Sequence, residues 1–163
     1  MTPQNNNLYS HYQKQFIKFK NKPALRLIDN KTIYYKDLEK ESAKIANYLR
    51  DLGVKIGDRV SVQVQKSPEA LYLYLACLRA GFVYHPLNVG YKEHELDFFF
   101  QNAKPSLVVC DESNLEIIKN LALKNKISKV LTLNSDSTGS LLEESKKCAS
   151  TFDTVHQKDN DLA

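Results

Sequence analysis

The sequence predicts an α/β fold, in which a parallel sheet with flanking helices, a Rossmann- or flavodoxin-like half-lobe, is preceded by a helix, a β-hairpin and a helix. From Val60 onward, short apolar runs alternate with helical segments, an order typical of parallel sheets with right-handed crossovers. Residues 106–110 form a short apolar run of the kind found in strands buried on both faces. The chain of 163 residues is 42% hydrophobic and 26% charged, which is the balance of a packed domain or of one lobe of a larger one.

Residues 1–59 are predicted to be a lead-in that stands outside this alternation. Residues 1–7 are polar and rich in Asn and Gln, so we expect them to be mobile. A first amphipathic helix, ending near Asn21, is predicted by four apolar residues at helical spacing: Leu8, Tyr12, Phe16 and Phe19.

A hairpin and a second helix complete the predicted lead-in. The apolar runs 24–28 and 31–35 are separated by an Asp-Asn pair, and both residue types tolerate a tight turn. The second helix ends at Gly53, which is free to adopt a left-handed cap. Its apolar stripe is Leu38, Ile45, Leu49 and Leu52.

Residues 60–150 are predicted to be the parallel α/β unit. The first strand alternates valines, at positions 60, 62 and 64, with polar residues, so one of its faces is expected to be more polar. Ser67 and Pro68 are a strong helix start, and this helix should reach Gly81. A strand at 82–87 follows, and its Pro86 places it at a strand end or an edge.

The second half of this unit continues the same order. A helix is predicted at 93–102, a strand at 106–110 and another strand at 129–133. Two capping boxes are predicted to begin the remaining helices, one made by Ser113 with Glu116 and one by Ser140 with Glu143. The tail, 151–163, is polar and is expected to be loosely held.

Ligand sites of parallel sheets lie beyond the carboxyl ends of the strands, so the predicted loops there were searched for chemistry. The loop after the first strand lacks the glycines of a dinucleotide site. Asp111 follows a strand but has no further carboxylates for magnesium, so we interpret it as a turn or cap residue. The segment 135–140 is interpreted as a flexible connector rather than a phosphate loop, and His85 as a packed, hydrogen-bonded histidine.

Several partners and sites are not expected. The net charge of +4 comes from lysines spread among acidic residues, without a basic block for nucleic acid. No histidine has the spacing of a metal ligand, and the three cysteines, Cys77, Cys110 and Cys148, are expected to be reduced. No signal peptide or membrane span is recognised, so we expect a cytoplasmic protein without a membrane partner.

A series of short motifs resembles the opening of the adenylate-forming (AMP-binding) acyl-CoA synthetases. The order and spacing of the motifs match together, although each alone is common. The matching segments are 35–38, 53–60, 67–71, 75–81, 84–88, 95–96, 103–105 and 108–111. The resemblance covers about residues 8–163. The sequences of segments 66–71, 75–81 and 91–99 are most similar to those of malonyl-CoA synthetases.

The resemblance implies a two-step reaction that uses ATP, Mg²⁺ and coenzyme A. A carboxylate first forms an acyl-adenylate, and the thiol of coenzyme A then displaces AMP. The family's phosphate loop, adenine site and C-terminal lid have no counterpart here, and residues 159–163 resemble the stretch that directly precedes the phosphate loop. We therefore expect an N-terminal fragment that is inactive alone, with no catalytic residue of its own and with Lys92 as the one candidate contact, for a phosphate of coenzyme A.

Alternatives to this interpretation remain open. The parent enzyme could belong to another adenylate-forming branch, such as an aryl-CoA ligase or an amino-acid adenylation domain. A different class of function is a non-catalytic module that self-associates, for example as a homodimer, through apolar surface.

Overall fold

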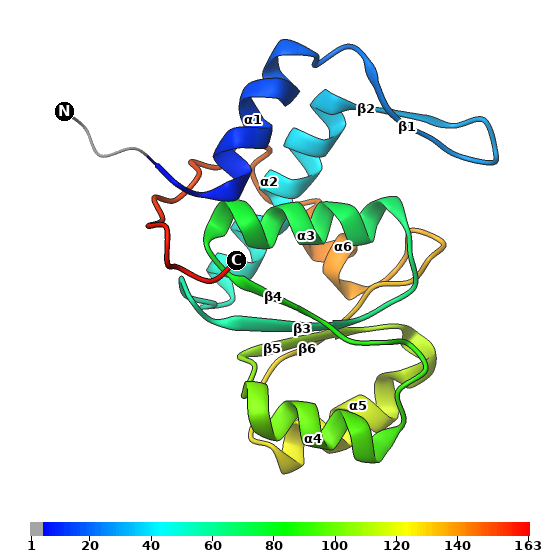
Figure 1. Cartoon of the computed structure of the whole chain (residues 1–163). Coiled ribbons are helices and arrows are strands. Elements are labelled where there is room, and N and C mark those ends of the chain that lie inside the picture. The colour runs from blue at the N-terminus through cyan, green and yellow to red at the C-terminus, as the bar shows by residue number, and fades with distance from the viewer. Residues whose placement is uncertain (1–4) are drawn as a thin grey trace.

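The computed structural model describes residues 5–163 of the chain (Figure 1). The predicted fold class is confirmed, because a four-stranded parallel sheet lies between two helical layers. The helices are α1 (Leu8–Lys18), α2 (Tyr35–Asp51), α3 (Pro68–Ala80), α4 (Glu93–Ala103), α5 (Leu115–Lys124) and α6 (Ser140–Ser145), with a 3₁₀ turn η1 at Glu112–Asn114. The strands are β1 (Pro23–Arg26), β2 (Thr32–Tyr34), β3 (Arg59–Gln63), β4 (Val83–Pro86), β5 (Leu107–Cys110) and β6 (Val130–Thr132).

The four-stranded sheet has the strand order β4-β3-β5-β6, and all three pairs are parallel. The two central strands are β3 and β5, which explains why every residue of β5 is buried. The edge strand β4 contains Pro86, in agreement with the prediction for this residue.

Helices cover both faces of this sheet (Figure 1). On one face, α2, α3 and α6 pack against the valines of β3 and against β5, and α1 packs against α2 and α3. On the other face, α4 and α5 enclose a smaller core that includes Phe100, Val108 and Ile118. We call these the α1–α3 layer and the α4–α5 layer.

The hairpin β1-β2 is a separate antiparallel sheet, as the sequence predicts. Its turn contains Asn30 at φ 64°, a left-handed conformation that Asn tolerates better than most residues. Figure 1 shows the hairpin projecting away from the two layers. Ile28 near its tip is fully exposed.

Local start and stop signals place the long helices where the sequence predicts them. The Ser67 side chain accepts a hydrogen bond from the Ala70 amide, and Pro68 is the first residue of α3. Gly81 ends α3 at φ 70°, and Gly53 follows α2 at φ 87°. These positive φ values are the reason why glycine ends both helices.

Both predicted capping boxes are wrong. The Asp111 carboxylate accepts the Ser113 amide and starts η1, so α5 begins later and without the Ser113–Glu116 exchange. The Ser140 hydroxyl accepts the Thr132 amide of β6 instead of capping α6. In both places the residues bond to another partner instead of to the residue three positions along the helix.

The buried face of α1 also differs from the prediction. Leu8 and Tyr12 of the expected stripe are more than a third exposed, whereas Tyr9 is fully buried against α2 and α3. The more polar face of β3 is confirmed, but Ser61 and Gln63 are completely buried under the α4–α5 layer. Tertiary packing has therefore overridden the predicted apolar stripe of α1, whereas the pattern of β3 is retained.

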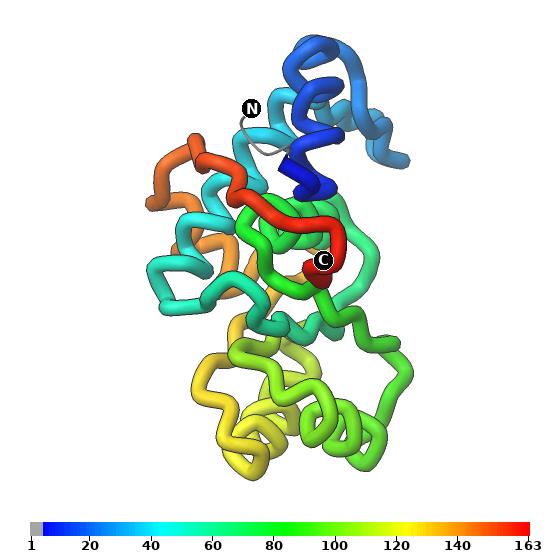
Figure 2. Tube along the Cα trace, turned by 60° about the vertical axis from the view of Figure 1, so that its left-hand side comes forward, coloured from blue at the N-terminus to red at the C-terminus, as the bar shows by residue number. Residues whose placement is uncertain are grey.

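The two ends of the chain hold one another, against the expectation of a mobile start and a loose tail. Residues 1–4 lie outside the described residues, but Asn7 is fully buried and its side chain donates to the carbonyls of Leu78 and Val155. The Asn6 amide donates to the carbonyl of Gln157, which is itself buried. Figure 2 shows the end of the chain running across the α1–α3 layer.

Within residues 5–163, no helix has both the length and the apolar character that a bilayer crossing requires.

Candidate functional site

The carboxyl ends of β3, β4, β5 and β6 meet at one edge of the sheet, which is the expected place for a ligand. We call this the carboxyl edge. Polar residues lead away from each strand there, including Gln63, Asn88, Asp111 and Asn134. The side chains of Gln63 and Asn134 bond to a neighbouring loop, whereas those of Asn88 and Asp111 accept amides of their own turns.

Gln63 anchors the middle of the carboxyl edge. Its Nε2 donates to the carbonyls of Asn88, at 3.0 Å, and of Tyr91, at 3.3 Å, which fixes the loop after β4 over the end of β3. The Oε1 atom is buried and has no hydrogen-bond donor among residues 5–163. A buried acceptor without a donor is costly, so a water molecule or another donor is expected to complete this position.

A polar hollow of about 450 Å³ opens at the ends of β5 and β6. Its lining includes Glu112, Lys119, Thr132, Asn134 and Ser140. The Asn134 side chain accepts the Glu112 amide at 2.9 Å, which joins the two strand ends. The hollow has hydrogen-bonding groups of both kinds but no pair of side chains placed for acid–base catalysis.

The segment 135–140, interpreted from the sequence as a flexible connector, leads from β6 into α6 and is held by its own side chains. The Asp136 carboxylate accepts the Thr138 hydroxyl and amide, and these two hydrogen bonds lower the pKa of Asp136 below its usual value. The Ser137 hydroxyl donates to Oε1 of Glu69 at 2.7 Å. The amides of Ser137, Thr138 and Ser140 all donate within the chain, so they are not free to bind a phosphate.

His85 is packed and hydrogen-bonded, as predicted. Its Nδ1 lies 2.8 Å from the hydroxyl of Ser61 on the neighbouring strand, and its ring contacts Phe99 edge-on. Burial, and next the charge of Arg59, lower the pKa of His85. Ser61 is a partner that sequence reasoning missed, but it is fully buried and so is no accessible nucleophile.

Lys92 immediately precedes α4 at the carboxyl edge. Its amide donates to the Glu95 carboxylate, and its side chain is exposed beside a hollow of about 470 Å³. Glu93 and Asp97 line the same hollow, so the surroundings of Lys92 are as acidic as they are basic. The geometry brings Lys92 to the correct edge without building an anion site around it.

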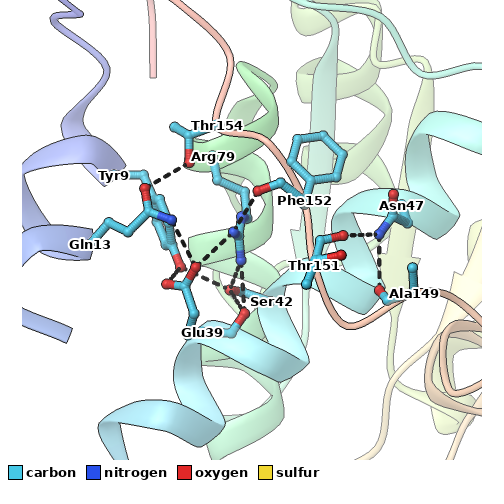
Figure 3. Close-up of polar contacts among 10 residues, drawn as sticks. All are labelled: Tyr9, Gln13, Glu39, Ser42, Asn47, Arg79, Ala149, Thr151, Phe152 and Thr154. Atoms are coloured by element: carbon cyan, nitrogen blue, oxygen red, sulfur yellow. Dashed lines mark hydrogen bonds and ion pairs between the residues drawn. The ribbon is translucent and has the colours of Figure 1, made fainter. Parts of the chain in front are cut away.

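A second polar feature is the buried junction around Arg79 (Figure 3). The Arg79 guanidinium is 1% exposed and donates to the carboxylate of Glu39 at 3.0 Å and to the hydroxyl of Ser42 at 3.0 Å. It also donates to the carbonyl of Phe152 at 2.9 Å and lies over the Tyr9 ring. Burial is the main reason why the pKa of Tyr9 is raised far above its usual value.

This Arg79 junction fixes the segment 149–157 against the α1–α3 layer. The Val155 amide donates to the Arg79 carbonyl, and Asn47 donates to the carbonyls of Ala149 and Thr151. Thr154 donates to Gln13 of α1, as Figure 3 shows. The signal for this junction in the sequence is Arg79, the one charged residue in the segment 70–80 of α3.

Metal chemistry has no support within residues 5–163, where no group of three or more His, Cys, Asp or Glu side chains is placed to hold an ion. The three cysteines are free, as predicted, with Cys77 and Cys110 buried. Burial raises the pKa of the Cys110 thiol to about 12, so this thiol is unreactive at neutral pH.

Comparison with known proteins identifies what this arrangement is similar to. A family model described as AMP-binding enzyme matches residues 12–163. The acetyl-coenzyme A synthetase of Pseudoalteromonas atlantica is 34% identical over 99 residues, which are 61% of this chain and 15% of that protein.

Solved structures give the same result for the fold. Apo MatB from Rhodopseudomonas palustris superposes with a TM-score of 0.89 and 40% identity, over 98% of this chain and 32% of that chain. A benzoate CoA ligase from Burkholderia xenovorans superposes with a TM-score of 0.82 at 17% identity, over 95% of this chain and 31% of that one, which shows the fold alone. The chain thus spans about a third of the length of the structures that it matches.

Proposed function

The chain belongs to the family of AMP-binding enzymes, and from this premise we propose that it is part of an ATP-dependent acyl-CoA synthetase. The parent protein would be an AMP-forming acid–thiol ligase of the cytoplasm. A carboxylate attacks the α-phosphate of ATP and releases pyrophosphate, and the coenzyme A thiol then attacks the acyl carbon and releases AMP. The products are acyl-CoA, AMP and pyrophosphate.

The observation that carries this proposal is a match along nearly the whole chain. Identity of 40% to MatB extends over 98% of the residues, together with the same fold. A shared fold by itself would not indicate a shared activity. Here the motifs from Tyr35 to Asp111 also lie in the matched region, in the same order as in the family.

Malonate is the acid that we propose. The sequence resemblance to malonyl-CoA synthetases and the similarity to MatB, a malonyl-CoA synthetase, both favour a small dicarboxylate. An acetyl-coenzyme A synthetase is also similar, over a shorter region, so acetate is the natural comparison substrate.

The reaction uses Mg²⁺, ATP and coenzyme A, and the residues of this chain suit these groups unequally. No three metal-ligating side chains gather within residues 5–163, so they do not fit Mg²⁺, and no step is assigned to the metal. For coenzyme A, Lys92 is the proposed phosphate contact, because it is exposed at the carboxyl edge. ATP and coenzyme A would be bound chiefly by other parts of the parent protein. This chain would form the sheet and loops against which those parts pack.

A pyrophosphate-release assay on the purified parent protein tests the proposal. With ATP, Mg²⁺ and coenzyme A, we expect malonate to give a higher kcat/KM than acetate or benzoate, and malonyl-CoA to appear as product. Lys92→Ala should raise the KM for coenzyme A without changing the KM for ATP. The absence of pyrophosphate release with every carboxylate would refute the proposed reaction, whereas a preference for benzoate would refute only the substrate.

We also propose that the 163-residue chain alone is inactive. The carboxyl edge, as described, has no catalytic pair and no group of three metal ligands, and its buried polar atoms without a partner are Oε1 of Gln63 and Oε2 of Glu69. Pyrophosphate release by the purified 163-residue chain, above a heat-treated sample, would show that this proposal is wrong.

A non-catalytic, self-associating module is the second candidate function. It is favoured by apolar side chains on the outer surface of α4 and α5, where Phe98 is 62%, Ile117 45% and Leu123 81% exposed. Sedimentation velocity tests this alternative, because a homodimer should appear as the concentration rises and be lost on Leu123→Glu. A monomer at every concentration would exclude it.

A further inference from the structure

The lysines that look evenly spread in the sequence gather in the folded lead-in. Between Lys14 and Lys36 there are seven basic side chains and a single acidic one, Asp29. The end of α1 and the start of α2 lie side by side, because the Lys36 amide donates to the Lys20 carbonyl and the Tyr35 amide to the Lys22 carbonyl. Figure 1 shows this joined end of the two helices at the far side of the α1–α3 layer from the sheet.

A groove of about 310 Å³ lies between these two helices, and we call it the α1–α2 groove. Its apolar part is made by Phe16 and by Ile17, which is 61% exposed. Three lysines surround this part, Lys20 from the turn after α1 and Lys36 and Lys40 from α2. The volume is at the lower end of the range of about 300–1,000 Å³ that is usual for small-ligand sites.

The charge of the groove is not balanced within the described chain. Lys20, Lys36 and Lys40 are exposed, and none forms an ion pair with a carboxylate among residues 5–163. The one acidic side chain in the lining, Glu39, is occupied, because Oε1 accepts from Arg79 and Gln13 and Oε2 accepts from Tyr9. The groove therefore presents cations around an apolar floor.

We propose that the α1–α2 groove binds an anionic amphiphile, with the alkyl part on Phe16 and Ile17 and the anionic head between Lys20, Lys36 and Lys40. The apolar floor lowers the free energy of an alkyl chain that leaves water, and the unpaired lysines attract its head group. A cationic or uncharged amphiphile lacks the second contribution. The head group can come from a free fatty carboxylate or from an anionic lipid, since both present the same chemistry.

Four probes with one alkyl chain separate charge from hydrophobicity in the purified chain: decanoate, decyl phosphate, decyl maltoside and decyltrimethylammonium. Isothermal titration calorimetry below the micellar concentrations should show saturable binding of the two anions. We expect their affinity to fall as salt is added and to exceed that of the other two probes at least about ten-fold, since close opposite charges attract and close like charges repel.

Variants on exposed positions assign the site without threatening the fold. Lys20→Glu with Lys36→Glu should lower the affinity for decanoate at least about ten-fold, because repulsion replaces attraction at both lysines. The matched control is Lys55→Glu with Lys158→Glu, which changes the net charge equally at exposed lysines outside the groove and should alter the affinity less than about two-fold. Ile17→Ser should weaken both anions and leave the salt dependence unchanged.

Vesicle flotation distinguishes the two sources of the ligand. Flotation with phosphatidylglycerol vesicles but not phosphatidylcholine vesicles, with the same dependence on Lys20 and Lys36, would identify a membrane lipid as the source. Decanoate binding without flotation would identify a free amphiphile. The proposal is overturned by equal binding of all four probes, by no binding of the anions, by equal losses in the groove and control variants, or by lysine-dependent binding of a single-stranded DNA oligonucleotide without decanoate binding.

Discussion

The two helical layers on the two faces of the sheet are held together by different interactions. The α4–α5 layer packs on the sheet through apolar side chains supplied by segments that follow one another in the chain, such as Phe100, Val108 and Ile118. The α1–α3 layer has a larger apolar core, but its outer part is joined by a buried polar junction around Arg79. The partners of Arg79 lie 40 and 73 residues away in the sequence, at Glu39 and Phe152.

This difference indicates that the layers respond differently to damage. Removing apolar volume from the α4–α5 layer should weaken the whole domain without releasing a particular segment. Removing the charge at the Arg79 junction should also loosen the segment 149–157, because the Phe152 carbonyl loses its guanidinium donor. The predictions below test this contrast, beginning with the largest effect.

Arg79→Met should lower the free energy of unfolding by about 4 kcal/mol, because the loss of one partner leaves buried polar groups unpaired while the apolar volume is kept. Urea unfolding measures this change. Hydrogen exchange should also show faster exchange of the Val155 amide, which donates to the backbone of residue 79.

Arg26→Met is the matched control for Arg79→Met. The Arg26 side chain is exposed at the end of β1 and forms no ion pair with a carboxylate among residues 5–163. Exchange of an exposed side chain of this kind changes stability by less than about 1 kcal/mol, so the control should unfold close to the wild-type midpoint. If Arg79→Met behaved like this control, the Arg79 junction would not stabilise the α1–α3 layer.

Ile118→Ala in the α4–α5 layer should lower the free energy of unfolding by about 3 kcal/mol, because the Ile118 side chain is fully buried and its truncation leaves a cavity. Amide hydrogen exchange in residues 149–157 should accelerate only by the amount that the loss of global stability causes. Ile117→Ala is the control, since the Ile117 side chain is 45% exposed on the same helix. A selective release of 149–157 by Ile118→Ala would remove the distinction between the layers.

Ser67→Ala should cost about 1 kcal/mol, because the Ser67 hydroxyl accepts the Ala70 amide at the start of α3. Ser113→Ala is the comparison, since Ser113 was predicted to cap α5 but its hydroxyl donates to Asp111 in an exposed turn. Urea midpoints should differ little between wild type and Ser113→Ala. An equal loss in both variants would mean that Ser113 stabilises the start of α5 as strongly as Ser67 stabilises α3.

These predictions follow the division between what sequence could and could not predict. The helix start at Ser67–Pro68, the helix end at Gly81 and the alternation after Val60 are local signals, and the structure confirms each of them. The order of the strands in the sheet was not predicted, because no local pattern says which parallel strands become neighbours.

The errors of sequence reasoning share a physical cause, which is a competing partner distant in the chain or hidden in a turn. The Ser140 hydroxyl bonds to β6, and the Asp111 carboxylate takes the Ser113 amide, so neither serine makes its predicted box. The tail looked loose because its composition is polar, but Arg79 and Asn7 bind its backbone. At the carboxyl edge, the loops were predicted correctly, whereas the Gln63 anchor became evident only in three dimensions.

The smallest predicted effect concerns His85, whose ring contacts Phe99 of the α4–α5 layer. Burial and the nearby Arg59 lower the pKa of His85 in the folded chain, so folding favours the neutral imidazole. This contribution is complete above the unfolded pKa, about 6.5, and is lost as the pH falls through the lower folded value. His85→Gln should therefore lose less stability than wild type between pH 7.5 and pH 5.0, as urea midpoints at the two pH values can show. His11→Gln is the control, because it removes an exposed histidine of α1. This variant should keep the wild-type difference between the urea midpoints at pH 7.5 and pH 5.0. If it reduced that difference as much as His85→Gln does, His85 would not be the group that responds to acid.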